Sequence, residues 1–311
     1  MKTSALGVTT VPGQLAGLRP LVGELMDLKR VRTPDQPDGI AAHGFRRAWA
    51  ALVSGVDPTT LALRETALAL TAVRLGGIDL DVLTQAGLPH ERALQALRRG
   101  LDAATGSVDP TLRERLNQAL AGLDGSTPHQ PPPAFVERLV LQPRAGPTCA
   151  NKARVVLPDG ESHADHCYVV AVASVLVSPL FGADPTVPFV AALSHHFFNV
   201  VLPDAGDYGD RLLGEDVAPM VARITEQVLG TLPGPLAERV REARKILPHT
   251  DSPEARAFHA ADTMDRVLEM EAHARAAGFT LRQALEDLEL IHGGPMQAYE
   301  NAVLVAAGLP H

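Results

Sequence analysis

The sequence predicts an all-α protein, and three observations lead to this prediction. Apolar residues recur at spacings of three and four along most of the 311-residue chain. Helix-capping residues, prolines and glycines mark the ends of these segments. Alternating β-branched patterns are scarce, and Arg154–Leu157 is the one short strand candidate. Apolar residues make up 46% of the chain, enough to bury one large core or two of ordinary size.

Five helices are expected in the N-terminal third, at residues 44–54, 58–75, 79–86, 89–103 and 109–123. Gly76-Gly77 ends the second of these helices, and Asp109-Pro110 is a favourable pair for starting the fifth. Proline and glycine then interrupt regular structure over residues 124–133. This linker divides the chain into a helical accessory domain, residues 1–130, and a second helical domain, residues 131–311.

Seven helices are expected in the second domain, at residues 162–178, 188–201, 216–229, 236–247, 253–277, 280–291 and 295–307. Ser162 with Asp165 three positions later is a capping-box pattern for the first of them. Residues 204–210 are acidic and contain glycine, so we expect a solvated loop there, directly after the second helix of this domain.

The composition excludes several classes of protein. The formal net charge is −8 and the basic residues are spread along the chain, unlike the basic stripe of a nucleic-acid binder. The two cysteines, Cys149 and Cys167, form no CxxC motif, which favours a reducing cytoplasm. We find no signal peptide, and the longest apolar run, residues 167–180, is too short to span a bilayer. Arginine greatly exceeds lysine, which is typical of a GC-rich bacterial genome. We therefore expect a bacterial, cytoplasmic protein without membrane or nucleic-acid partners.

Histidines in apolar helices are the strongest chemical signal in the sequence. His166 shares a helix face with Val169 and Val170, and alone it would be read as a hydrogen-bonded core residue. His195 and His196 lie side by side in an almost wholly apolar segment. Burying each imidazole costs roughly 1–3 kcal/mol unless it has a partner, and one metal ion would serve both. Adjacent residues on a helix diverge by about 100°, so a shared ion must lie between their directions.

Asp262 is a third element of this pattern. It lies in a mostly apolar segment and shares a helix face with His259 and Arg266. Taken alone, the presence of Asp262 in this apolar segment would be explained by an ion pair with Arg266.

Four segments in this order resemble the HD-domain superfamily of metal-dependent phosphohydrolases, most closely its 5′-deoxynucleotidase-like branch. They are Glu161-Ser-His-Ala-Asp-His166, Ala191-Ala-Leu-Ser-His195 with the adjoining His196, Leu202-Pro-Asp204, and Ala260-Ala-Asp262. The similarity spans roughly residues 150–275 and leaves the N-terminal third outside. It implies an HD-like helical bundle whose metal ligands are His166, His195, His196 and Asp262. It also implies a phosphate site at Arg154 with Lys152 close by, and it places Asp204 near the attacking water.

Two departures from the family pattern change the expected chemistry. His196 stands where the family has an aspartate that bridges two metals. An imidazole does not normally bridge, so we expect one divalent ion, and Fe, Zn, Co or Mn suits three histidines and one aspartate better than Mg. Asn199 occupies the catalytic position where the deoxynucleotidase branch has a glutamate. Because an amide cannot act as a general base, Asp204 or the metal centre must supply that role.

The sequence therefore predicts a metal-dependent phosphohydrolase that acts on a nucleotide or another small phosphate monoester. Two alternatives stay open: an HD-type oxygenase with two irons, and a degenerate HD domain that senses a ligand without catalysis. The expected partner is a small phosphorylated molecule, and a homo-oligomer is compatible with the sequence.

Overall fold

The computed structural model describes residues 11–123, 130–146, 148, 160–277, 280–287, 290–291 and 293–310, and this part of the chain is helical without any strand. The all-α prediction is confirmed. The strand candidate Arg154–Leu157 lies outside the described residues.

The structure contains α-helices and short 3₁₀ segments (η) in the following order. They are α1 (Val11–Leu25), η1 (Met26–Lys29), α2 (Ile40–Val53), α3 (Pro58–Leu75), α4 (Leu80–Gln85), α5 (His90–Ala104), α6 (Pro110–Ala121), α7 (Ala134–Leu141), α8 (His163–Phe181), α9 (Thr186–Ser194), η2 (Phe197–Val200), α10 (Gly206–Leu213), η3 (Gly214–Asp216), α11 (Val217–Leu229), α12 (Gly234–Arg244), α13 (Pro253–Ala277), α14 (Leu281–Asp287), η4 (Gly294–Met296) and α15 (Gln297–Ala307).

Helix boundaries follow the capping residues where the sequence supplies them. Asp57 accepts the backbone N–H groups of Thr59 and Thr60 at the start of α3, and Asp109 accepts the Leu112 N–H at the start of α6. Both α3 and α13 have the predicted bounds.

Three helices were not expected from the sequence: α1, α7 and α10. Helix α1 contains Pro20 and three glycines, which disfavour a helix, yet Leu15, Leu18 and Val22 on it are buried. Tertiary packing therefore overrides local propensity. Helix α10 forms within the acidic segment that was expected to be a loop, and its side chains stay partly or fully exposed.

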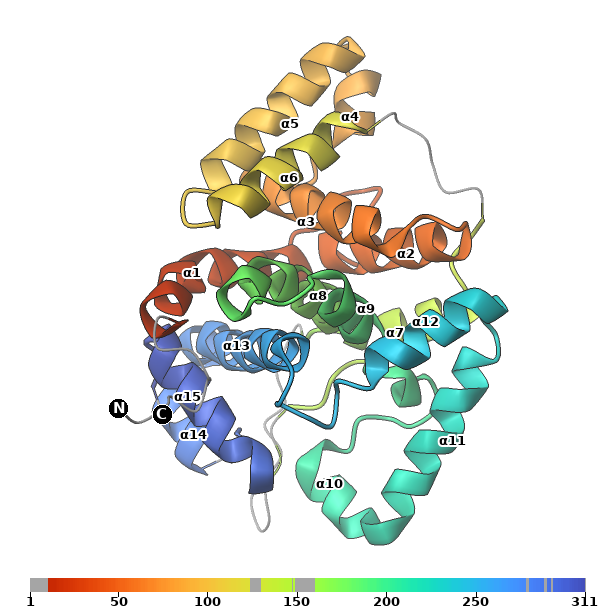
Figure 1. Cartoon of the computed structure of the whole chain (residues 1–311), viewed down its shortest axis with the longest axis vertical. Coiled ribbons are helices and arrows are strands. Elements are labelled where there is room, and N and C mark those ends of the chain that lie inside the picture. Colours follow the sequence, from red (N-terminus) through yellow and green to blue (C-terminus); the bar gives the residue numbers. More distant parts are fainter. Residues whose placement is uncertain are drawn as a thin grey trace.

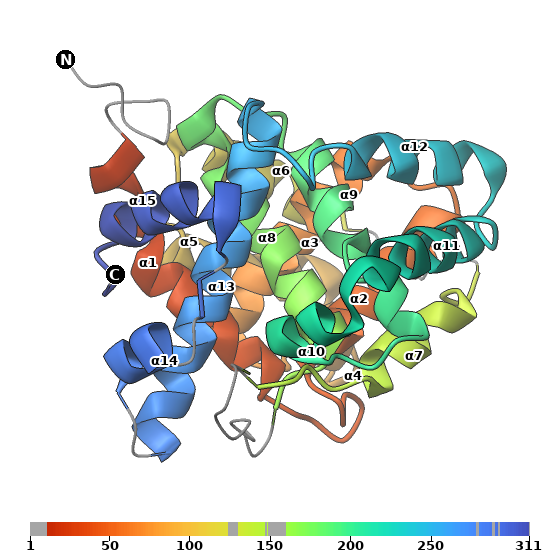
Figure 2. The same cartoon turned by 90° about the horizontal axis from the view of Figure 1, so that it is seen from below.

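Helix α8 lies at the centre of the molecule (Figures 1 and 2). Helices α1, α2 and α3 pack on it from the N-terminal part of the chain, and α7, α9 and α13 pack on it from the remainder. The contact with α2 is close, because a Cβ on Gly44 would lie 2.3 Å from Cζ of Tyr168. This helix is longer than the apolar run suggested: it has 19 residues and could cross a membrane by length and composition alone. Its apolar window is 89% buried inside the molecule, as in a core helix.

One hydrophobic core extends across the predicted domain boundary. The Trp49 ring on α2 lies 5.0 Å from the Phe135 ring on α7 and 5.5 Å from the Phe197 ring in η2. Helices α4, α5 and α6 lie at one end of the molecule, where α5 and α6 pack on α3, far from α10 and α11 (Figure 1). The functional division at residues 130 and 131 stays a prediction.

Candidate metal centre

His166 lies in the first turn of α8, directly after the capping box predicted for this helix. The Ser162 Oγ accepts the Asp165 N–H at 3.1 Å, and the Ser162 N–H donates to Asp165 Oδ2 at 3.0 Å. These bonds fix where α8 begins. The His166 side chain consequently points inward and is fully buried.

Helix α13 holds both ring nitrogens of His166. Asp265 Oδ2 lies 2.6 Å from Nδ1, and Asp262 Oδ1 lies 3.2 Å from Nε2. The two aspartates are three positions apart, so they lie on one face of α13. The ion pair expected between Asp262 and Arg266 is also present, with 3.4 Å between Oδ2 and Nε. Asp262 thus has one oxygen for Arg266 and the other for the histidines.

The second predicted helix is shorter than expected, and this changes the geometry of the histidine pair. Helix α9 ends at Ser194, and His195 and His196 lie in a turn before η2 rather than inside a continuous helix. The Arg244 guanidinium donates to the Ser194 carbonyl and lies over the Phe197 ring, which satisfies the helix end. The two imidazoles therefore do not diverge as in a helix, and their ring centroids are 4.2 Å apart.

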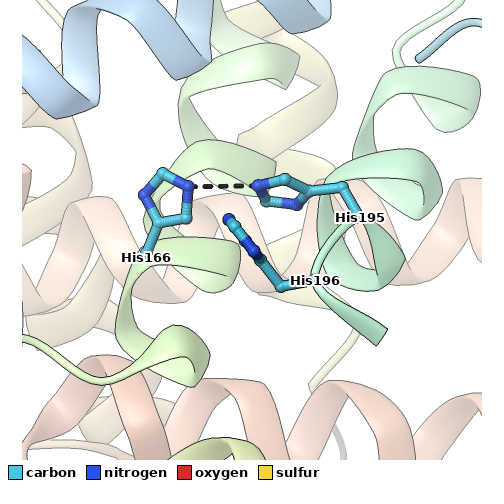
Figure 3. Close-up of side chains that lie close together, drawn as sticks. All are labelled: His166, His195 and His196. Carbon is cyan, nitrogen blue, oxygen red and sulfur yellow. Dashed lines mark hydrogen bonds between the residues drawn. The ribbon is translucent and has the colours of Figure 1, made fainter. Parts of the chain in front are cut away.

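Figure 3 shows the three imidazoles of the centre with their ring nitrogens facing one another. Each Nδ1 faces its own acceptor: Asp265 for His166, the Ala192 carbonyl at 2.6 Å for His195, and Asn199 Oδ1 at 2.8 Å for His196. An Nδ1–H that donates leaves Nε2 with its lone pair. The Nε2 atoms of His166 and His195 lie 3.0 Å apart.

These residues fit a divalent metal ion. The three imidazoles each offer a nitrogen, and these three atoms lie within 4.8 Å of one another. Two lone pairs at 3.0 Å with the Asp262 carboxylate beside them repel each other unless a cation lies between them. In a tetrahedral site with bonds of about 2.0–2.1 Å, neighbouring ligand atoms are about 3.3 Å apart. The His166 Nε2 atom lies 3.0 Å from His195 Nε2 and 3.2 Å from Asp262 Oδ1, close to that spacing, and His195 Nε2 lies 4.0 Å from Asp262 Oδ1. Acceptors on the opposite ring nitrogens are typical of histidines that bind metal.

Burial keeps two of these imidazoles neutral. It lowers the pKa of His195 to about 3 and, together with the charges of neighbouring groups, lowers the pKa of His196 well below its usual value. Burial and Arg144 also act against protonation of His166, but Asp265 and Asp262 outweigh them and raise its pKa. Positive charge is therefore favoured at the His166 Nε2 atom, where a metal would lie.

A cavity of about 770 Å³ opens onto this centre. His196 and Asn199 lie in its wall with Arg144, Asp204 and Arg266. Apolar side chains also line the cavity; they include Phe198, Leu202, Leu213, Val217, Val221, Met270 and Leu290. The cavity thus places a metal centre, a cationic side chain and a carboxylate around one space.

Arg144 in this wall was not identified from the sequence. An isolated antiparallel bridge between Pro143 and Ser162 places Arg144 beside Glu161, and its Nη1 lies 2.7 Å from Glu161 Oε1. Neither segment is helical, so the periodicity of the sequence carries no signal of their pairing. Arg154 and Lys152, the predicted phosphate-binding residues, lie outside the described residues.

Asp204 and Asn199, the predicted catalytic residues, both line the cavity. Asp204 Oδ2 accepts the Ala145 N–H and Oδ1 accepts the Gly206 N–H, each at 2.9 Å. The Asn199 amide is fixed at both ends, because its Oδ1 faces His196 and its Nδ2 donates to the Leu202 carbonyl at 3.1 Å. Asn199 is therefore placed to orient His196. The catalytic assignment of both residues stays a prediction.

The structure buries His163 completely. Its ring centroid lies 4.6 Å from that of His196, and its Nε2 lies 4.0 Å from Asp204 Oδ2. Burial is the main cause that lowers its pKa to about 2. It adds a fourth imidazole to the cluster, and burial keeps this one neutral.

Glu161, His166 and Asp265 form a second group of side chains that could bind a metal ion. The ammonium group of Lys29 already lies among them. The Lys29 ammonium lies 2.8 Å from Asp265 Oδ1, contacts Glu161, and lies 3.4 Å from Glu269 Oε2. Lys29 belongs to η1 and is 4% exposed. The sequence did not indicate this contact, because Lys29 precedes Glu161 by more than a hundred residues.

Residues 136–289, just under half of the chain, match the family model described as HD domain. No curated protein and no solved structure matches the chain significantly. The match covers the three histidines, Asp262 and Asp265, and it confirms the resemblance to the superfamily but not to the deoxynucleotidase branch. Residues 136–289 are therefore similar in sequence to the HD domain.

Proposed function

We propose that this protein is a metal-dependent phosphohydrolase that acts on a nucleotide or another small phosphate monoester. One observation carries the proposal. Three imidazole nitrogens and an Asp262 oxygen converge, and His196 of this group lines a cavity whose wall also contains the half-buried Arg144. A phosphate monoester needs both features, a cationic centre beside its reacting phosphorus and a donor fork for its remaining oxygens.

Each polar residue of the cavity has a separate role in the proposed hydrolysis. A bound divalent ion would lower the pKa of water and offset phosphate charge. Arg144 holds an N–H fork toward the cavity, and its pairing with Glu161 keeps the guanidinium oriented. Asp204 supplies the carboxylate that accepts a proton, and its two backbone donors hold it in place. Asn199 keeps the His196 ring oriented.

We propose one metal ion per chain, and Fe, Zn, Co or Mn as its identity. Three neutral imidazoles and one carboxylate are intermediate ligands, which suit these ions better than Mg. The site has an imidazole, His196, where a carboxylate would bridge two ions. The proposed setting is the cytoplasm, without nucleic-acid or membrane partners, since the net charge of −8 opposes binding to polyanions.

Metal analysis of the purified protein followed by a phosphatase screen tests the proposal. We expect about one transition-metal ion per chain and phosphate release from nucleotides or other monoesters when that ion is present. Two irons per chain with oxygen consumption would instead support an HD-type oxygenase. Absence of metal under every loading condition would exclude both enzymes and leave the non-catalytic alternative.

Two arginine substitutions, one in the cavity and one on the surface, distinguish phosphate binding from a general effect of lost charge. Arg144→Ala is expected to lower kcat/KM by about a hundredfold, because a charge-assisted contact to phosphate is lost. Arg241→Ala is the matched control, since Arg241 forms ion pairs with Glu226 and Glu238 on the surface, away from the cavity. Equal activities of the two variants would contradict the role of Arg144.

A further inference from the structure

A chain of charged contacts connects the N-terminal part of the protein to the metal centre. Lys29 Nζ lies 2.8 Å from Asp265 Oδ1, and the other oxygen of Asp265 lies 2.6 Å from His166 Nδ1. The far nitrogen of the same ring faces His195 at 3.0 Å. Lys29 lies outside the segment that matches the HD domain.

We infer that Lys29 is a positioning residue of the metal centre, which acts on His166 through Asp265. The Lys29 ammonium holds one oxygen of Asp265, and the other oxygen accepts the His166 Nδ1–H. That hydrogen bond fixes the ring plane and leaves the Nε2 lone pair directed at the metal position. The N-terminal helices therefore complete the centre.

The surroundings of Asp265 show why Lys29 matters to this carboxylate in particular. Glu161 is also paired with Arg144, and Glu269 is also paired with Arg30 and His273. Among the described residues, Lys29 is the one Lys or Arg that forms an ion pair with Asp265. Asp265 is fully buried, so without Lys29 its direct ion-pair partner among the described residues would be His166 alone.

The inference rests on metal binding at the histidine centre and is independent of phosphate hydrolysis. The test measures the affinity of the full-length protein for Co²⁺ by titration of its visible absorption. Lys29→Met is expected to weaken binding about tenfold to hundredfold, as for other residues that orient a metal-binding histidine.

Arg47→Met is the matched control for loss of a buried ion pair. Arg47 pairs with the fully buried Glu65 at 2.7 Å and also contacts Tyr168 of α8, but it belongs to neither the cavity nor the histidine cluster. We expect its Co²⁺ affinity to stay within about twofold of wild type. Circular dichroism establishes that each variant is folded. The double variant Lys29→Met/Glu269→Gln removes one positive and one negative charge together, so it leaves fewer unpaired buried carboxylates than Lys29→Met alone. We expect the same loss of Co²⁺ affinity in this double variant.

A double-mutant cycle distinguishes positioning from a general structural role. In an Asp265→Asn background, Lys29→Met is expected to change Co²⁺ affinity by no more than about threefold, because the residue that transmits its effect is gone. Equal losses in both backgrounds would overturn the inference, as would wild-type affinity in Lys29→Met. If the wild-type protein itself bound no Co²⁺, the metal centre as a whole would be wrong, which is a separate result from an unchanged variant.

Discussion

His166 is held at both ring nitrogens by carboxylates of a single helix, and this arrangement defines the chemistry available at the centre. Asp265 lies at Nδ1 and Asp262 lies at Nε2. A carboxylate at Nδ1 makes the imidazole a stronger ligand, and a carboxylate at Nε2 adds a fourth donor for the same ion. A second ion would need a bridging oxygen, and His196 offers a nitrogen in place of one.

His196→Asp tests whether this imidazole limits the centre to one metal. Because a carboxylate can bind two ions through its two oxygens, we expect the metal content to rise from one to about two per chain. Elemental analysis after loading measures the ratio. His196→Asn is the control, since an amide has a similar shape without the charge. An unchanged ratio in His196→Asp would count against the alignment with the family aspartate.

Asn199→Leu tests whether the amide orients His196. The substitution removes the acceptor of the His196 Nδ1–H, and we expect metal affinity to fall by about tenfold or more. Ser194→Ala is the control, because the Ser194 hydroxyl is buried nearby and bonds only to carbonyls of its own helix, at Val190 and Ala191. Comparable Co²⁺ affinities in the two variants would show that Asn199 has no such role.

At the residue scale, the sequence predicts the histidines well and the charged residues around them poorly. A pair of histidines in an apolar segment stands out because burial without partners is costly. Arg144 and Lys29 stand out in no such way, since charged residues near loops and helix ends are ordinary on a protein surface. The positions of these two cations depend on tertiary contacts: Lys29 is buried against Glu161, Asp265 and Glu269, and the half-buried Arg144 pairs with Glu161.

Among the helices, α8 depends most directly on its first residues for function. The capping box at Ser162 fixes the turn that contains His166, so a change in the cap is expected to affect both stability and metal binding. The box was predicted from the sequence because its two residues are only three positions apart.

Ser162→Ala is expected to lower the free energy of unfolding by about 1 kcal/mol, the usual effect of losing an N-cap. Asp57→Ala removes the corresponding cap of α3, where Asp57 accepts two N–H groups at 3.1 Å, and should cost a similar amount. Urea unfolding measures both effects. Only Ser162→Ala is expected to weaken Co²⁺ binding. Equal Co²⁺ affinities of the two variants would show that the cap of α8 does not affect metal binding.

The end of α9 shows why some element boundaries could not be predicted. Residues 188–201 form an unbroken apolar run, which by itself favours one continuous helix. The helix ends at Ser194, where the guanidinium of Arg244 from α12 contacts the terminal carbonyl. The deciding residue lies fifty positions later, beyond any local pattern.

The whole molecule is joined by a buried ionic network that connects η1, the segment before α8 and α13. Glu269 on α13 contacts Lys29, Arg30 and His273 and is 4% exposed. Burial raises the pKa of Glu269, but Lys29, His273 and Arg30 together outweigh burial and lower it below its ordinary value of 4.5. A carboxyl group with a lowered pKa stabilises the fold above its unfolded pKa, and this contribution is lost as pH falls toward the folded one.

Glu269→Gln should therefore be less stable than wild type near neutral pH and should approach wild type in acid. Urea unfolding of metal-free protein at about pH 6 and about pH 3.5 measures the difference in the free energy of unfolding. Glu242→Gln is the control, since Glu242 is 63% exposed in its pair with Lys245 and should show little difference at either pH. The same difference in the free energy of unfolding between Glu269→Gln and wild type at both pH values would contradict a contribution from the ionised Glu269.

The fold class and most helices could be predicted because they depend on local periodicity, while the assembly of the site depends on tertiary contacts. The proposed metal ligands come from the order of four segments in the sequence, and the structure brings the three histidines and Asp262 together. The shared core between the N-terminal helices and α8 was not predicted, because the proline-rich segment at residues 124–133 is also what separate domains would show.

The central position of α8 has a consequence for synthesis of the chain on the ribosome. Helices α1, α2 and α3 are made before α8, whereas α13 begins about 70 residues after α8 ends. At roughly 5–20 residues per second, several seconds separate the two. During that interval the nascent α8 has cover only from the helices that precede it and the few that follow directly. We therefore expect the N-terminal helices to supply much of the cover of this apolar segment while the chain is still incomplete.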